Sequence, residues 1–341
     1  MKQKKGTSRM LAVLAAWLCA TTTVQHADAL PGGLDGLPPE IAASYDSGSY
    51  HQAAAALETA VEQNPNEASL RYWLGRCYYE VRDFDHSISS WERAVALDSA
   101  RSEYHDWLGR AYGRKAEQDA HTKMASALSL ARRTHREFEV AVQLDARNVD
   151  AQRDLIAYMA SAPSNLGGGE ANALNQISAL SAVDPLEGML ALADLYAERK
   201  KFEEASNEYQ KVLKSAVGRV DAYFEVADYY RDRGDAERVG QAVAAALKVA
   251  PSDRRLNYYR GVALVLENRE SEVAEKALRT YIETVPDNSE VPAHSSAYEY
   301  LGKLYENRGQ PDLAVEQYKS GLVLDPQDKG LRDALKRLHA K

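Results

Sequence analysis

The sequence repeats itself with a period of 34 residues. Residues 73–78, Trp-Leu-Gly-Arg-Cys-Tyr, return at 107–112 as Trp-Leu-Gly-Arg-Ala-Tyr. The same period connects three later small residues that lie among apolar and aromatic neighbours, namely Ala193, Ala227 and Gly261. Gly302 follows after 41 residues, which is one period plus seven. A chain of this kind folds from one unit that is copied along its length.

Each unit contains a second recurring segment. Sixteen residues after the small position stand larger residues, Trp91, Tyr209, Val243 and Tyr318, and prolines follow at 65, 185, 251, 286 and 326. Apolar residues spaced three and four apart predict one buried stripe on each of two helices. The small residue allows the second helix to approach, and proline ends that helix because it cannot continue the hydrogen-bond ladder. A lone helix pair cannot bury its stripe on both sides, so the units are expected to stack.

This pattern resembles the tetratricopeptide repeat, which has a 34-residue period, a tryptophan-leucine-glycine-tyrosine spacing and a closing proline. The resemblance implies an all-α, right-handed superhelical solenoid. We expect about eight helix-turn-helix repeats over residues 40–328 and a capping helix over 329–341.

Three stretches depart from the period, near 114–132, 162–170 and 287–294. In the first, the large residue Phe138 comes 29 residues after Gly109 instead of 16. Its composition predicts an elongated helix, with Met124, Leu128 and Ala131 continuing the apolar stripe, that protrudes from the stack or braces it. The second contains three glycines, 167–169, but lacks the lysine and hydroxyl residue of a nucleotide loop, so we interpret it as an inter-helix loop.

Residues 1–29 have the basic, apolar, small-residue order of a secretory signal, with cleavage expected after Ala29. Residues 30–39 are rich in proline and glycine and read as a linker. The sequence thus predicts an exported protein, periplasmic or secreted, with no membrane span after cleavage. The formal net charge is −8, and residues 1–29 carry mostly lysine and arginine, so removing them makes it more negative. This charge argues against nucleic acid as a partner.

Cys77 would be the only cysteine of the exported chain, because Cys19 lies in the signal. No intramolecular disulfide can then form. Arg71 and Arg82 could activate the thiol by favouring the thiolate. Alanine occupies the matching position 111 of the next repeat, which favours the alternative that Cys77 is a small packing residue.

In tetratricopeptide proteins, one face of each first helix lines a concave groove that holds partners. Residues spaced four and then three apart share that face. When the same positions are taken in successive repeats, the resemblance implies that the groove is lined by Tyr72, Arg76, Tyr79, Arg110, Arg114, Asp194, Phe224, Asp228 and Arg231. Arginine and tyrosine at the N-terminal end suit an acidic or C-terminal peptide. The alternative is that these charges merely pair with neighbours such as Asp106. The chaperone-clamping lysine and asparagine set of some family members is absent.

The sequence shows no catalytic, nucleotide-binding or metal-binding motif, and His105, His121 and His135 lack the spacing of metal ligands. We therefore expect no enzymatic activity and no cofactor, and a protein or peptide partner for a scaffold or assembly adaptor of the cell envelope. Two alternatives remain open: an accessory subunit of an envelope enzyme, and a structural homo-oligomer joined through the elongated helix. The sequence leaves the oligomeric state open.

Overall fold

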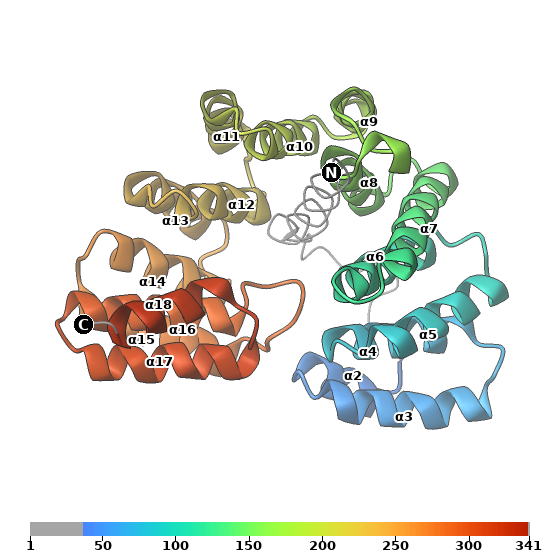
Figure 1. Cartoon of the computed structure of the whole chain (residues 1–341), viewed down its shortest axis with the longest axis horizontal. Helices are drawn as coiled ribbons and strands as arrows, with labels where there is room; N and C mark the ends of the chain where they lie inside the picture. Colours follow the sequence, from blue (N-terminus) through green and yellow to red (C-terminus); the bar gives the residue numbers. More distant parts are fainter. Residues whose placement is uncertain (1–36, 340–341) are drawn as a thin grey trace, which may run out of the picture. The chain divides into compact units, whose positions relative to one another are not determined.

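The computed structural model describes residues 37–339, and this part of the chain is entirely helical, with no β-strand (Figure 1). The prediction of an all-α solenoid of helix pairs is confirmed. The helices are α2 (Pro39–Asp46), α3 (Tyr50–Gln63), α4 (Ala68–Glu80), α5 (Phe84–Leu97), α6 (Ser102–Asp119), α7 (Met124–Leu144), α8 (Val149–Ser161), η1 (Ser164–Leu166), α9 (Glu170–Val183), α10 (Pro185–Glu198), α11 (Phe202–Ser215), α12 (Val220–Arg231), α13 (Ala236–Val249), α14 (Leu256–Leu266), α15 (Ser271–Thr284), α16 (His294–Asn307), α17 (Pro311–Leu324) and α18 (Lys329–His339).

The helices form two compact units, residues 37–211 and 212–339, and the boundary falls inside α11. Within each unit, consecutive helices pack side by side as antiparallel neighbours, as α4 does with α5 and α16 with α17. The expected signal, residues 1–29, and most of the expected linker lie outside the described residues. None of the helices in residues 37–339 is both long and apolar enough to cross a membrane.

Local sequence signals begin and end these helices. Asp83 precedes α5 and accepts a hydrogen bond from the backbone amide of His86, and Asp235 caps α13 in the same way. Pro185 stands in the first turn of α10, where its missing amide proton has no helical partner to lose. Since α9 ends at Val183, Pro185 separates the two helices as the sequence predicts.

Tyrosine hydroxyl groups link neighbouring helices through carboxylates. Tyr112 of α6 donates to Glu92 of α5 at 2.6 Å, and Tyr259 of α14 donates to Asp228 of α12 at 2.9 Å. A buried phenol needs such an acceptor. At these two positions a phenylalanine could pack but could not make the bond.

The first insertion lengthens both helices of its pair. α6 has 18 residues and α7 has 21, and a turn at residues 120–123 joins them. The expected stripe is confirmed in part: Ala131 and Phe138 are buried together with Ala127, whereas Met124 and Leu128 are only partly covered. The expected single elongated helix is divided into α6 and α7 by the turn.

The glycine loop after α8 is held by its own backbone. Gly168 and Gly169 donate their amides to the carbonyls of Pro163 at 3.1 Å and Met159 at 2.8 Å. Gly167 and Gly169 have φ values of 91° and 134°, which other residues rarely adopt. Because these amides are already paired, the loop connects helices and offers no nest for an anion.

Candidate binding face on the first helices

The arginines expected at the N-terminal end of the groove pack on one tryptophan. The guanidinium carbon of Arg76 lies 3.8 Å from the ring centroid of Trp107, and that of Arg110 lies 4.5 Å from it. Tyr79 meets the same ring edge to face at 5.4 Å. Cation–π contact and ring packing hold these four side chains together on α4 and α6.

Arg76 is buried, with 1% of its surface exposed, and Tyr72 stacks on Tyr104 at 5.2 Å. Both residues were expected to face outward into a groove. The structure corrects this expectation, because the aromatic rings of successive first helices close over these positions.

Arg110 binds two carboxylates. Its Nη2 atom lies 3.1 Å from Asp106 in the preceding turn of α6, and its Nε atom donates to Asp154 of α8 at 2.5 Å. The three side chains are 12%, 3% and 7% exposed for Arg110, Asp106 and Asp154. Burial raises the pKa of Asp106 well above its usual value, although Arg110 opposes that rise. Arg110 therefore pairs with acidic neighbours, as the alternative interpretation of the sequence holds, and it connects neighbouring repeats.

Arg114 remains accessible one turn further along α6. Its side chain is 27% exposed and lies 3.5 Å from Glu117, whose own side chain is 8% exposed. Burial raises the pKa of Glu117 to about 8, and the nearby arginines Arg114 and Arg82 only partly counter that effect. The raised pKa favours the neutral form of Glu117, which weakens its pairing with the charge of Arg114.

Asp194 on α10 belongs to a second arginine-centred network. Arg153 of α8 donates to Asp194 at 2.8 Å and to Glu187 at 2.7 Å, and Tyr209 also donates to Asp194. The Asp194 side chain is still 43% exposed. Desolvation of the carboxyl group raises its pKa despite the partial exposure of the side chain and the nearby Arg153.

Arg153 escaped the sequence analysis, although a signal was present. Arg153 and Glu187 are 34 residues apart, and so are Asp221 and Arg255, which pair at 2.7 Å in the second unit. Opposite charges one period apart occupy equivalent places on successive first helices. That spacing could have predicted both ion pairs.

In the second unit, α12 carries Phe224, Asp228 and Arg231. Phe224 is 1% exposed and stacks on Tyr259 with centroids 4.4 Å apart, so it belongs to the core and not to an open face. Asp228 pairs with Arg231, and burial raises the pKa of Asp228 to about 6. Arg231 also contacts the hydroxyl of Tyr258 at 3.2 Å.

The histidines noted in the sequence do not form a cluster. His105 is 7% exposed and lies between Glu137 at 2.7 Å and the carbonyl of Ser99 at 3.2 Å, and His135 stacks on Tyr158. His105 is therefore a buried residue held by two hydrogen-bond partners. Across residues 37–339, no three histidine, cysteine, aspartate or glutamate side chains converge as metal ligands would.

Stacked helix pairs of this kind define an α-solenoid, a protein built from helical repeats that contact their neighbours. The tetratricopeptide repeat family matches residues 43–102, 190–238 and 265–329, slightly more than half of the sequence. The chain belongs to the tetratricopeptide repeat family. No curated protein matches the chain.

Solved structures resemble this chain at low sequence identity. Yeast Tom70, in its crystal structure, is 13% identical to this chain. The match covers 99% of this chain and 72% of the Tom70 chain, with a TM-score of 0.59. A tetratricopeptide repeat protein from Parabacteroides merdae is 15% identical over 84% of this chain and 99% of its own, with a TM-score of 0.45. YrrB, described as a tetratricopeptide repeat protein with an unusual peptide-binding site, is 17% identical over 63% of this chain and 99% of its own, with a TM-score of 0.35. These likenesses concern the fold alone.

Proposed function

We propose that this chain is a non-catalytic scaffold of the bacterial cell envelope that binds a protein or peptide segment and acts as an assembly adaptor. Membership of a repeat family that presents helix faces to other proteins supports the binding role. The basic, apolar and small-residue order of residues 1–29 supports export to the periplasm or the exterior.

The proposal rests on the exposure and the weak pairing of Arg114. Among the arginines expected in the first unit, Arg76 and Arg110 are covered or paired, whereas Arg114 is 27% exposed beside a glutamate with a pKa of about 8. A partly exposed guanidinium that is only weakly paired attracts a partner carboxylate and can bind it through two parallel hydrogen bonds. The partner segment is therefore acidic or ends in a free carboxylate.

Affinity capture from envelope extracts, followed by mass spectrometry, identifies the partner. The matched variants are Arg114→Glu on α6 and Arg136→Glu on the exposed side of α7, which change the net charge equally. We expect Arg114→Glu to weaken binding of the captured partner by about tenfold or more and Arg136→Glu to leave it unchanged. Equal loss in both variants would indicate non-specific attraction, and retention in both would refute a role for this face.

Export is tested separately. The chain is expressed with its own N-terminus in a Gram-negative host, and the intact mass of the protein is measured in the periplasmic fraction. A chain that begins at Leu30 is expected. A cytoplasmic product with residues 1–29 still attached would refute the envelope assignment without affecting the binding proposal.

A further inference from the structure

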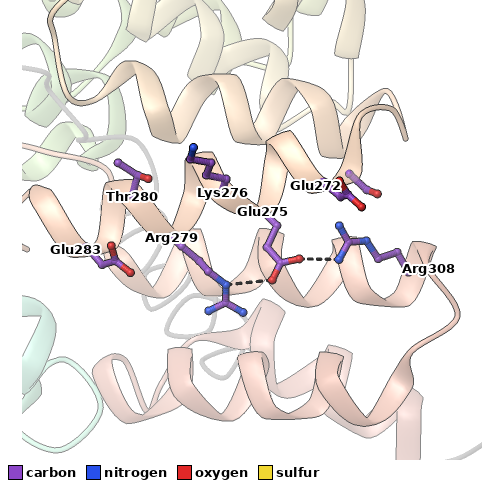
Figure 2. Close-up of a pocket in the computed structure, with 8 residues that line it drawn as sticks. Glu272, Glu275, Lys276, Arg279, Thr280, Glu283 and Arg308 are labelled. Atoms are coloured by element: carbon purple, nitrogen blue, oxygen red, sulfur yellow. Dashed lines mark hydrogen bonds and ion pairs between the residues drawn. The ribbon is translucent and has the colours of Figure 1, made fainter.

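A charged pocket lies along α15 in the second unit, outside the first-helix faces described above (Figure 2). Its volume is about 630 Å³. α15 packs on its neighbours through Ala274, Ala277, Leu278 and Tyr281, so its pocket side is a different side of the helix. Charged side chains dominate the lining, and these are Glu272, Glu275, Lys276, Arg279, Glu283 and Arg308.

Glu275 holds two guanidinium groups in place. It accepts hydrogen bonds from Arg279 at 3.1 Å, from Arg308 at 2.6 Å and from the hydroxyl of Tyr305 at 2.5 Å. Figure 2 shows Arg308 reaching from the end of α16 toward the carboxylate that Arg279 also contacts. Burial by itself raises the pKa of Glu275, but the hydrogen bonds from Tyr305, Arg308 and Arg279 outweigh it and lower that pKa. The carboxylate is thus saturated by its own donors.

Arg308 keeps donor capacity that Glu275 does not use, whereas Arg279 also donates through its Nη2 atom to the hydroxyl of Tyr305 at 2.9 Å. The Nη2 atom of Arg308 is buried and has no hydrogen-bond acceptor among the described residues. Leaving a charged donor unsatisfied is costly, and an incoming oxyanion would remove that cost. Lys276 adds a third cation to the lining.

Acidic residues stand at both ends of the pocket. Glu272 and Glu283 are eleven residues apart on α15, which is roughly 16 Å along a helix axis. An extended peptide covers that length with about five residues. The charge order along the pocket is therefore acidic, basic, acidic, and its complement is a segment with one acidic residue between two basic residues.

We propose that this pocket binds the carboxylate of an acidic side chain in an extended partner segment that carries a basic residue on each side. The arginine pair, oriented by Glu275, receives the carboxylate, and the two terminal glutamates receive the flanking cations. A phosphate group fits less well, because its second negative charge meets three glutamates in the same lining. This site does not depend on the binding face of α6.

The test uses the full exported chain and two fluorescein-labelled peptides, acetyl-Lys-Ala-Glu-Ala-Lys-amide and its glutamine-centred counterpart, with binding followed by anisotropy. The full sequence has a net charge of −8, which becomes more negative without residues 1–29, so non-specific attraction favours the more positive glutamine peptide. We expect the glutamate peptide to bind at least fivefold more tightly, a preference opposite to the one that the overall charge of the protein favours. Equal affinity, or a preference for glutamine, would overturn the proposal.

Single substitutions test whether the preference for the glutamate peptide arises in this pocket. Arg308→Gln is expected to abolish it, whereas Arg269→Gln, which removes an arginine that is 67% exposed and outside the lining, is expected to keep it. Lys276→Gln leaves the bonds to Glu275 intact and is expected to weaken the preference, which provides a second readout if Arg308→Gln does not fold. Displacement of the peptide by 10 mM inorganic phosphate would reassign the site to phosphate. Retained preference in Arg114→Glu would show that this site and the proposed α6 face act separately.

Discussion

Trp91 occupies the space that the missing side chain of Gly75 leaves open. A Cβ atom at Gly75 would lie 2.6 Å from Cε2 of the indole ring, and the ring nitrogen donates to the carbonyl of Tyr72 at 3.1 Å. Trp91 is fully buried. The next repeat copies the relationship, because a Cβ at Gly109 would lie 2.6 Å from Phe138. The small and large residues of the repeat are therefore one packing unit.

Gly75→Ala is predicted to destabilise the protein. Overpacking against a rigid ring costs about 1–3 kcal/mol, and the better helix propensity of alanine offsets up to about 1 kcal/mol of that. The control is Gly240→Ala in α13, where the added Cβ meets only the end of the Glu267 side chain at 3.3 Å. Urea unfolding should show a lower midpoint for Gly75→Ala and an unchanged or higher one for Gly240→Ala. A neutral Gly75→Ala would mean that the indole can shift without cost.

Arg110→Ala is predicted to cost about 3 kcal/mol in the free energy of unfolding. The substitution leaves Asp106 and Asp154 buried without their cation. Removing one partner of a buried ion pair costs more free energy than the intact pair contributes to stability. Arg114→Ala, on the same helix but 27% exposed, should cost at most about 1 kcal/mol. Similar losses in the two variants, measured by chemical unfolding, would show that the Arg110 bridges carry no special weight.

Glu117 makes stability depend on pH. Its pKa rises from the ordinary 4.5 to about 8 in the folded chain, so the native state keeps a proton that the unfolded chain releases. The free energy of unfolding from this group is therefore highest below pH 4.5 and falls as the pH rises to 8, by at most about 1.4 kcal/mol per pH unit.

Glu117→Gln removes this dependence because the amide does not titrate. Other groups titrate in both proteins, so the prediction concerns the difference between them. The stability of the variant relative to the wild type should increase from pH 5 to pH 8, as measured by urea unfolding at each pH. A constant difference across that range would contradict the raised pKa.

Cys77 is predicted to resist alkylation in the folded protein. It is fully buried, and burial raises the pKa of the thiol to about 12 although Arg76 opposes the shift. The packing interpretation of this residue is confirmed. In a chain that starts at Leu30, iodoacetamide at pH 8 should label native Cys77 at least a hundredfold more slowly than the urea-unfolded chain, because only the thiolate reacts. Rapid labelling of native protein would indicate an accessible thiol.

The repeat made the fold predictable from sequence. Gly75 and Gly109 mark the same place in two copies, and the interchange of Cys77 with Ala111 indicates a small buried position from the sequence alone. Such inferences succeed because each repeat contacts only its neighbours, so local spacing determines which side chains meet.

Exposure was less predictable. Arg76 and Phe224 stand at positions that face a groove in the family, yet both are 1% exposed. Helical phase gives the direction of a side chain but not what covers it. Arg76 packs on Trp107 and Phe224 stacks on Tyr259, and both partners come from a neighbouring repeat.

The ion-pair partners of charged residues were also hard to predict from the sequence. Asp194 was expected to line the groove, and Arg153 from the previous first helix binds it. The sequence alone determined the helix pairs, their period and the small and large residues that lock them, because those depend on spacing within about one repeat. The tertiary structure decided which arginines remain available and which are used between repeats, since that choice depends on distances between side chains that no periodicity contains.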